Sequence, residues 1–175
     1  MSNTHYSTKI VGIGSEVPRF FNAIRYLVLF EDSLVLPELR DFSVLHSGNK
    51  LNADIKQGDV LKLAGEEYTV IKVGEDVASN IRTLGHIIIK FDGGEGELLA
   101  GSIHVENKPL DLAKIESGSE LAFCEASVEL LNGCKVAIKG VGGEFSKKFT
   151  QLMLDNGAEI VGEESADVVA TVKAK

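Results

Sequence analysis

Turn signals recur roughly every 8–15 residues over the first 127 positions of this sequence, and they keep every element between them short. The runs between these signals are β-prone, because they gather β-branched and aromatic residues. Residues 86–91, His-Ile-Ile-Ile-Lys-Phe, are the clearest of them. The other expected strands cover residues 7–14, 26–30, 42–46, 60–63, 68–73, 102–105 and 119–124. Many short strands at this spacing predict a mainly β fold, a small closed barrel or a sandwich.

Two local expectations complete this picture of the first 127 residues. Residues 42–46 are expected to end in a turn, because Ser-Gly-Asn follows them at positions 47–49. Residues 75–83 are polar with spaced apolar positions, which predicts a short helix or a turn. No internal repeat is evident.

The last 48 residues have a different pattern. A β-prone run at 135–139 precedes a glycine loop at 140–143, apolar residues at helical spacing over 145–153, and two more β-prone runs at 158–161 and 168–172. This order predicts a short βαβ extension. We therefore expect a barrel domain over residues 1–127 and an α/β extension of unknown role over 128–175. The glycine loop resembles half of a dinucleotide fingerprint, and a tight strand-to-helix turn and a loose phosphate nest both remain open.

Charge and cysteine content bound the function. The net charge is −8 and the pI is about 5.0, which argues against nucleic-acid binding. Residues 128–175 hold seven acidic and six basic residues, so −7 of the −8 lies in residues 1–127. Cys124 and Cys134 have no CxxC spacing and are expected to be buried free thiols in a reducing compartment. No apolar run approaches the ~18–20 residues of a membrane span, and no signal-peptide core is present, so we expect a cytoplasmic protein.

The four histidines are the candidate reactive groups, because imidazole is available as a nucleophile near pH 7. His5 lies in a polar terminus and is expected to be incidental. His46 ends an apolar run, which would place it at a strand's edge within reach of a partner. His86 follows a glycine that could re-aim it, and His104 should face away from its apolar neighbours. An ordinary structural role remains an alternative for each. The histidines lack HxH or HxxxH spacing and the chain lacks GxSxG, so neither a metal nor a cofactor nor a serine hydrolase is predicted.

Two motifs carry a resemblance to a known family. Residues 80–93, Asn-Ile-Arg-Thr-Leu-Gly-His-Ile-Ile-Ile-Lys-Phe-Asp-Gly, and residues 101–105, Gly-Ser-Ile-His-Val, resemble the glucitol/sorbitol-specific enzyme IIA component of the bacterial phosphoenolpyruvate-dependent phosphotransferase system. The opening strand, with Thr-Lys-Ile at 8–10 and Ile-Gly at 13–14, is also similar to that family. The resemblance spans roughly residues 5–125.

The resemblance implies a phosphocarrier on a small closed β-barrel. It places the phosphohistidine at His46 and makes His86 and His104 supporting neighbours, although residues 47–50 depart from the family pattern. Phospho-HPr would be the donor, the IIB component the acceptor, and glucitol, sorbitol or a related polyol the sugar. Contact with the membrane would be only indirect, through the IIC component. The acidic barrel suits a basic carrier protein, and a homo-oligomer is left open. The alternative is a non-catalytic regulatory or ligand-binding module on the same barrel.

Overall fold

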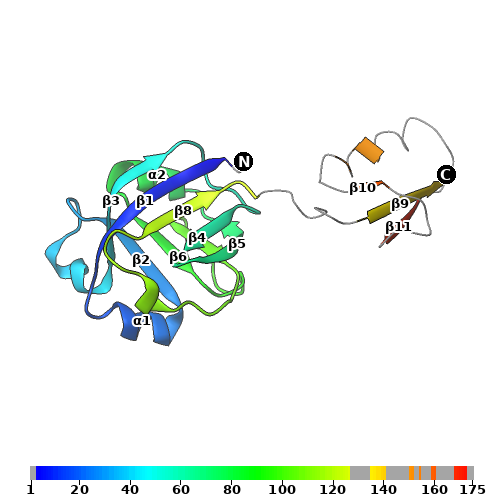
Figure 1. Ribbon diagram of the computed structural model, residues 1–175. Coiled ribbons are helices and arrows are strands. Elements are labelled where there is room, and N and C mark those ends of the chain that lie inside the picture. Colours follow the sequence, from blue (N-terminus) through cyan, green and yellow to red (C-terminus); the bar gives the residue numbers. More distant parts are fainter. Residues whose placement is uncertain are drawn as a thin grey trace. The chain divides into compact units, whose positions relative to one another are not determined.

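The chain folds into two compact units, Met1–Ala126 and Ser127–Lys175. Their boundary lies one residue before the position at which the sequence pattern changes. The structure, a computed structural model, describes residues 3–126, 135–140, 150–151, 154, 159–160 and 168–172 (Figure 1).

The first unit is a closed eight-stranded barrel in the order β1-β3-β2-β6-β7-β5-β4-β8, so the predicted mainly β barrel is confirmed. Two α-helices and two short 3-10 helices connect the strands. None of the described helices is long and apolar enough to span a membrane. The strands are β1 (Thr4–Ile13), β2 (Tyr26–Glu31), β3 (Val44–Leu51), β4 (Val60–Leu63), β5 (Glu66–Val73), β6 (Ile87–Lys90), β7 (Ser102–Val105) and β8 (Glu120–Cys124), and the helices are α1 (Val17–Ile24), η1 (Pro37–Phe42), α2 (Val77–Leu84) and η2 (Leu112–Lys114).

The barrel core is filled by alternate residues of each strand, as the period of two requires. Leu27 and Leu29 of β2 and Ile87 and Ile89 of β6 are at most 1% exposed. Each α-helix adds a pair of buried apolar residues to this core, which are Val17 and Phe21 in α1 and Val77 and Ile81 in α2. The outward-facing positions of the same strands are left for a functional surface.

The barrel consists of two halves that follow the same path, although the sequence analysis found no repeat. β3 pairs parallel to β2 and antiparallel to β1, and β7 pairs in the same way to β6 and β5. Gly14 and Val17 in the first half correspond to Gly74 and Val77 in the second, an offset of 60 residues in both cases. The repeat escapes detection in the sequence because the halves share a glycine and an apolar pattern rather than long runs of identical residues.

Replacement of Gly14 or Gly74 by alanine is predicted to destabilise the barrel strongly and to a similar extent. A Cβ atom would lie 2.2 Å from the Asp41 carbonyl oxygen at Gly14 and 2.2 Å from the Ala100 carbonyl oxygen at Gly74. Backbone atoms cannot swing aside as a flexible side chain does, so Gly14→Ala and Gly74→Ala should each lower the free energy of unfolding by about 3 kcal/mol. Denaturant unfolding measures this loss. Gly12→Ala is the control, because its nearest contact would be an ordinary 3.7 Å, and an equal loss there would contradict the prediction.

The short helix or turn expected over residues 75–83 is helix α2, but the other local expectation for the barrel is wrong. β3 does not end at residue 46 but continues to Leu51 through the expected turn, with Gly48 at φ +72°. The β1–β3 register shifts between Ser7 and Lys9, a bulge that accommodates the irregular segment without ending the strand. Helix α1 was not expected, although a proline in its first turn is a sequence signal for a helix start. In the structure the helix ends at Arg25, whose φ is 61°.

The second unit contains a three-stranded parallel sheet in the order β10-β9-β11. Its strands are β9 (Lys135–Gly140), β10 (Glu159–Ile160) and β11 (Val168–Val172), close to the expected runs. Residues 150, 151 and 154 are helical. The glycine loop beyond Gly140, most of the expected helix over 145–153, and Cys134 lie outside the described residues.

Candidate functional site

The carboxyl end of β2 brings His46 and His86 together. Glu31 of β2 lies beside His46 of β3 in the parallel register. Phe30 stacks on His86, with ring centroids 4.0 Å apart and an interplanar angle of 12°. Gly85 joins the two histidines, because it precedes His86 in the chain and its carbonyl oxygen lies 2.6 Å from His46 Nε2. Two of the three expected site histidines therefore share one end of the barrel.

His46 points into the barrel and is fully buried, so the expectation that a partner could reach it at a strand's edge is wrong for this conformation. Burial lowers its pKa below 6.5, against hydrogen bonding to Gly85 and the charge of Glu31, and the ring is neutral at pH 7. The carbonyl of Gly85 can only accept, so Nε2–H donates to it and Nδ1 carries the lone pair. Glu31 Oε2 lies 3.8 Å from that Nδ1.

The Thr8 hydroxyl forms a hydrogen bond with the lone pair on Nδ1 of His46. Its Oγ1 is 2.8 Å from Nδ1 and donates its proton there. The same Oγ1 lies 3.0 Å from the Ser47 carbonyl oxygen, which offers the hydroxyl proton a second acceptor. Thr8 occupies the bulge in the β1–β3 pairing, a feature that often re-aims a side chain next to a functional site.

His86 has the opposite exposure. Ile87 and Ile89 face the core, so His86 lies on the outer side and is half-buried. Its Nδ1–H donates to the Leu29 carbonyl oxygen at 2.9 Å, which leaves the lone pair on Nε2. Burial lowers its pKa below 6.5, so this ring is also neutral at pH 7. Nε2 forms no hydrogen bond with any residue that the structure describes, and the stack on Phe30 holds the ring in place.

The structure does not bring His104 to this site. His104 of β7 lies opposite Lys90, and Lys90 lies opposite Tyr26 at the start of β2, whereas His46 lies opposite Glu31 at its end. Five residues of strand separate the two positions, which is about 16 Å. His104 is fully buried, and its Nδ1 lies 2.8 Å from Asp92 Oδ1. Burial opposes ionisation of Asp92, but hydrogen bonds from the Gly94 N–H and from His104 lower its pKa.

Comparison with known proteins identifies the chain. A sequence model of the family described as "PTS system glucitol/sorbitol-specific IIA component" matches residues 5–122. The chain belongs to this family. Two "PTS system glucitol/sorbitol-specific EIIA component" proteins, from Shigella flexneri and Escherichia coli (strain K12), are each 28% identical to it over 118 residues, which are 67% of this chain and 93% of the relative.

A solved structure has the same fold as this IIA component. "The Crystal Structure of PTS System IIA Component from Enterococcus faecalis V583" matches with a TM-score of 0.57 and 20% identity, over 67% of this chain and 98% of that one. The resemblance stated from the sequence motifs is thus confirmed. As a glucitol/sorbitol-type IIA component, the protein is a phosphoryl carrier of a sugar phosphotransferase system. The family match ends at residue 122, so the second unit lies outside it.

His5 is not incidental in this IIA component. It is 8% exposed, and its Nδ1 lies 2.7 Å from Asp59 Oδ2. Asp59 also accepts a hydrogen bond from the Lys56 N–H at 2.8 Å. The His5–Asp59 interaction links the start of β1 to the turn before β4, which is a structural role. Within the described part of the chain, no group of three His, Cys, Asp or Glu side chains is placed to hold a metal ion.

Sequence reasoning did not assign Thr8, Phe30 or Glu31 to the candidate site, and it named Gly85 only as a glycine that could re-aim His86. Gly85 offered the clearest signal, because a glycine directly after a helical pattern is typical of a helix end. It ends α2 at φ +56°, and a Cβ atom there would lie 2.6 Å from Glu31 Cβ. The other three sit in strands, and only the pairing of those strands brings them to the histidines.

The two lowered histidine pKa values predict that the IIA domain loses stability in acid. The unfolded chain binds protons at His46 and His86 near pH 6.5, while the folded state binds them only at lower pH. Stability is therefore complete above about pH 7 and falls as the pH drops through 6.5 and below. Melting temperatures from pH 8 to 5 should show this decline, and it should be shallower in His46→Gln/His86→Gln. An equally steep decline in that variant would contradict the assignment.

Proposed function

We propose that this IIA component takes a phosphoryl group from phospho-HPr onto a histidine of the His46–His86 site and passes it to a cysteine of the IIB component. The transported sugar would be glucitol, sorbitol or a related polyol, as in the names of the relatives. One observation carries the proposal: two neutral imidazoles of fixed tautomer lie at one end of the barrel in a member of a IIA family. A neutral imidazole with a free lone pair is the form that attacks phosphorus.

The transfer balances without a further reactant. The imidazole lone pair forms the new N–P bond while the N–P bond of the donor phosphohistidine breaks, and its electron pair returns to the donor nitrogen. In the second step a thiolate of the IIB component attacks phosphorus, and the imidazole nitrogen leaves. Phosphoryl transfer through a loose transition state chiefly requires in-line positioning, which fixed ring orientations provide.

His46 is the acceptor that the sequence resemblance implies, and we retain it as the proposed phosphohistidine. Its neutral charge state, its fixed tautomer and the lone pair on Nδ1 support the role. Uptake requires the barrel end to open, since the ring is fully buried. The Thr8 hydroxyl would first transfer its hydrogen bond from Nδ1 to the Ser47 carbonyl oxygen, which it already approaches.

His86 is a second candidate acceptor because of one specific observation. Its Nε2 lone pair has no hydrogen-bond partner among the described residues, and its ring is half-exposed on the outer side of the barrel. A partner protein would reach this half-buried ring with less movement of the barrel than the fully buried His46 requires. If His46 is the acceptor, His86 would orient the phosphoryl oxygens after it takes up a proton, because only a protonated Nε2–H can donate to them.

The direct experiment is to incubate the full chain with enzyme I, HPr and phosphoenolpyruvate. The intact protein should gain the mass of one phosphoryl group, and the gain should require HPr. A chain that gains nothing, while a known IIA component is phosphorylated in the same mixture, would support the alternative of a non-catalytic module on the same barrel.

A further inference from the structure

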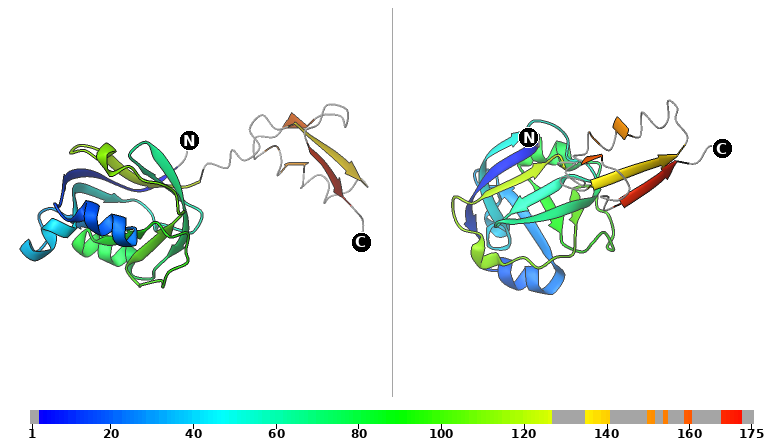
Figure 2. Two further views of the ribbon diagram at one scale, coloured as in Figure 1. Left: turned by 90° about the horizontal axis from the view of Figure 1, so that it is seen from below. Right: turned by 45° about the vertical axis from the view of Figure 1, so that its right-hand side comes forward.

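Residues 34–42, called here the apolar segment, expose four large apolar side chains directly after β2. Leu34, Leu36, Leu39 and Phe42 are 54%, 61%, 38% and 45% exposed. Figure 2 shows this segment, which includes η1, on the same side of the barrel as α1. Several exposed apolar residues gathered in one segment are typical of a protein interaction site rather than of a free surface.

The apolar segment lies beside the histidine site. It begins three residues after Glu31, whose carboxylate approaches His46, and four after Phe30, which stacks on His86. The backbone of Asp32 donates to the His46 carbonyl oxygen at 2.8 Å. Leu84, 46% exposed, directly precedes Gly85 and adds apolar surface there. A protein bound to the segment would therefore stand next to both candidate acceptors.

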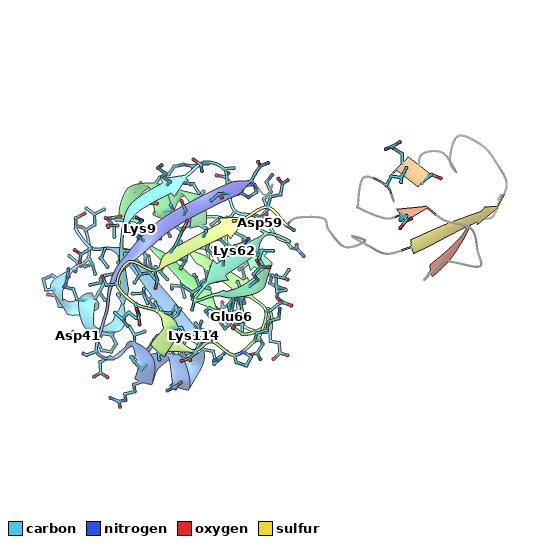
Figure 3. The ribbon with its side chains drawn as sticks, viewed as in Figure 1. Lys9, Asp41, Asp59, Lys62, Glu66 and Lys114 are labelled. Carbon is cyan, nitrogen blue, oxygen red and sulfur yellow. The ribbon has the colours of Figure 1, made fainter. Side chains whose placement is uncertain are left out.

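The charge of this surface is acidic. Residues 31–42 contain four carboxylates and one guanidinium. Arg40 is already paired with Asp32 at 2.6 Å. Glu38 and Asp41 form no ion pair with any residue that the structure describes, and Figure 3 shows Asp41 at the outer edge of the barrel. The partner that fits this surface carries an apolar patch with basic groups around it.

We infer that the apolar segment is the docking surface for the phosphoryl donor, phospho-HPr, which would bind through an apolar patch with basic groups around it. The inference rests on the proposed function and adds to it the surface through which the donor is recognised. A standard interface covers about 800 Å² on each partner, so a footprint centred on the segment extends to the nearby histidines. The leucines supply the apolar contact, and the unpaired carboxylates steer the basic groups of the donor to it.

The test is the kinetics of phosphoryl uptake in Leu34→Ser/Leu36→Ser. These two side chains are the most exposed of the segment, so their replacement costs the fold little. The KM for phospho-HPr should rise about tenfold while kcat stays within about twofold, because the contact is made before and during transfer alike. The matched control is Leu98→Ser/Leu99→Ser, since these leucines are 43% and 42% exposed on the corresponding connection of the other half. The control should keep the wild-type KM.

A charge variant gives an independent measurement. Glu38→Gln should raise the KM by a smaller factor and make it less sensitive to added salt, because a steering charge has been removed. A salt dependence unchanged from the wild type would count against the charge argument and the donor's identity.

The outcomes separate this inference from the function on which it rests. If the wild-type chain takes up no phosphoryl group, the proposed function fails and the docking surface falls with it. If the wild type is phosphorylated and Leu34→Ser/Leu36→Ser keeps its KM, or both double variants raise it equally, only the docking surface is overturned. A wild-type dimer that the variant dissociates without a change in KM would assign the segment to a second copy of the chain, and this too overturns the inference.

Discussion

Replacing His46 with glutamine is expected to abolish phosphoryl uptake from phospho-HPr, a loss of at least about 10³-fold. Glutamine is a close substitute in every respect except nucleophilicity. Its amide N–H can donate to the Gly85 carbonyl, and its amide oxygen can accept from Thr8, so both hydrogen bonds of the imidazole have replacements. The variant should therefore fold and melt like the wild type, and intact-mass measurement after incubation with enzyme I, HPr and phosphoenolpyruvate would show the loss.

His86→Gln is the matched comparison for that measurement. As a supporting group beside the acceptor, His86 should contribute about 10²-fold to the rate, and the variant should still reach one phosphoryl group per chain. The reverse pattern, with uptake in His46→Gln and none in His86→Gln, would move the acceptor role to His86. Full uptake by both single variants and by His46→Gln/His86→Gln would place the acceptor outside this pair.

Gly85→Ala is expected to have the second-largest effect, because it damages stability and the site together. At φ +56° a side chain is strained, and its Cβ would lie 2.6 Å from Glu31 Cβ and 3.3 Å from His46 Cε1. The left-handed conformation costs about 1–2 kcal/mol, and overpacking adds about 1–3 kcal/mol. We expect a loss of about 3 kcal/mol and a melting temperature lowered by about 10 °C. The displaced carbonyl would release His46 Nε2, so phosphoryl uptake should also slow.

Gly118→Ala separates the two contributions to this loss. Gly118 has φ +94°, but a Cβ there would meet nothing within 4 Å, so the variant carries the backbone strain alone. It should lose less stability than Gly85→Ala and should keep the wild-type rate of uptake. Equal stability losses, together with an unchanged rate in Gly85→Ala, would show that Gly85 neither packs tightly against Glu31 nor holds His46.

The sequence was sufficient for the parts of the site that depend on local order. The β-branched run after Leu84-Gly85 predicted β6 and placed His86 at its start, and the structure has His86 directly before the first residue of that strand, Ile87. Alternation also placed His104 on the face opposite its apolar neighbours, but it gave no sign that this second face is covered as well. All four residues of β7 are in fact buried. Alternation distinguishes two faces of a strand, but it does not reveal when both faces are covered.

The sequence by itself determined that this chain forms a barrel of short strands and that it belongs to a IIA family, and it predicted an α/β unit after the barrel. These properties depend on short-range patterns in the sequence, namely turn spacing, β-propensity and two contiguous motifs. Only the tertiary structure decided that His46 is buried under Thr8, that His86 lies half-buried on the outer side of the barrel, and that His104 lies elsewhere. Each of these depends on the register between strands that are distant in the chain, and register is fixed by the packing of the whole barrel rather than by any one segment.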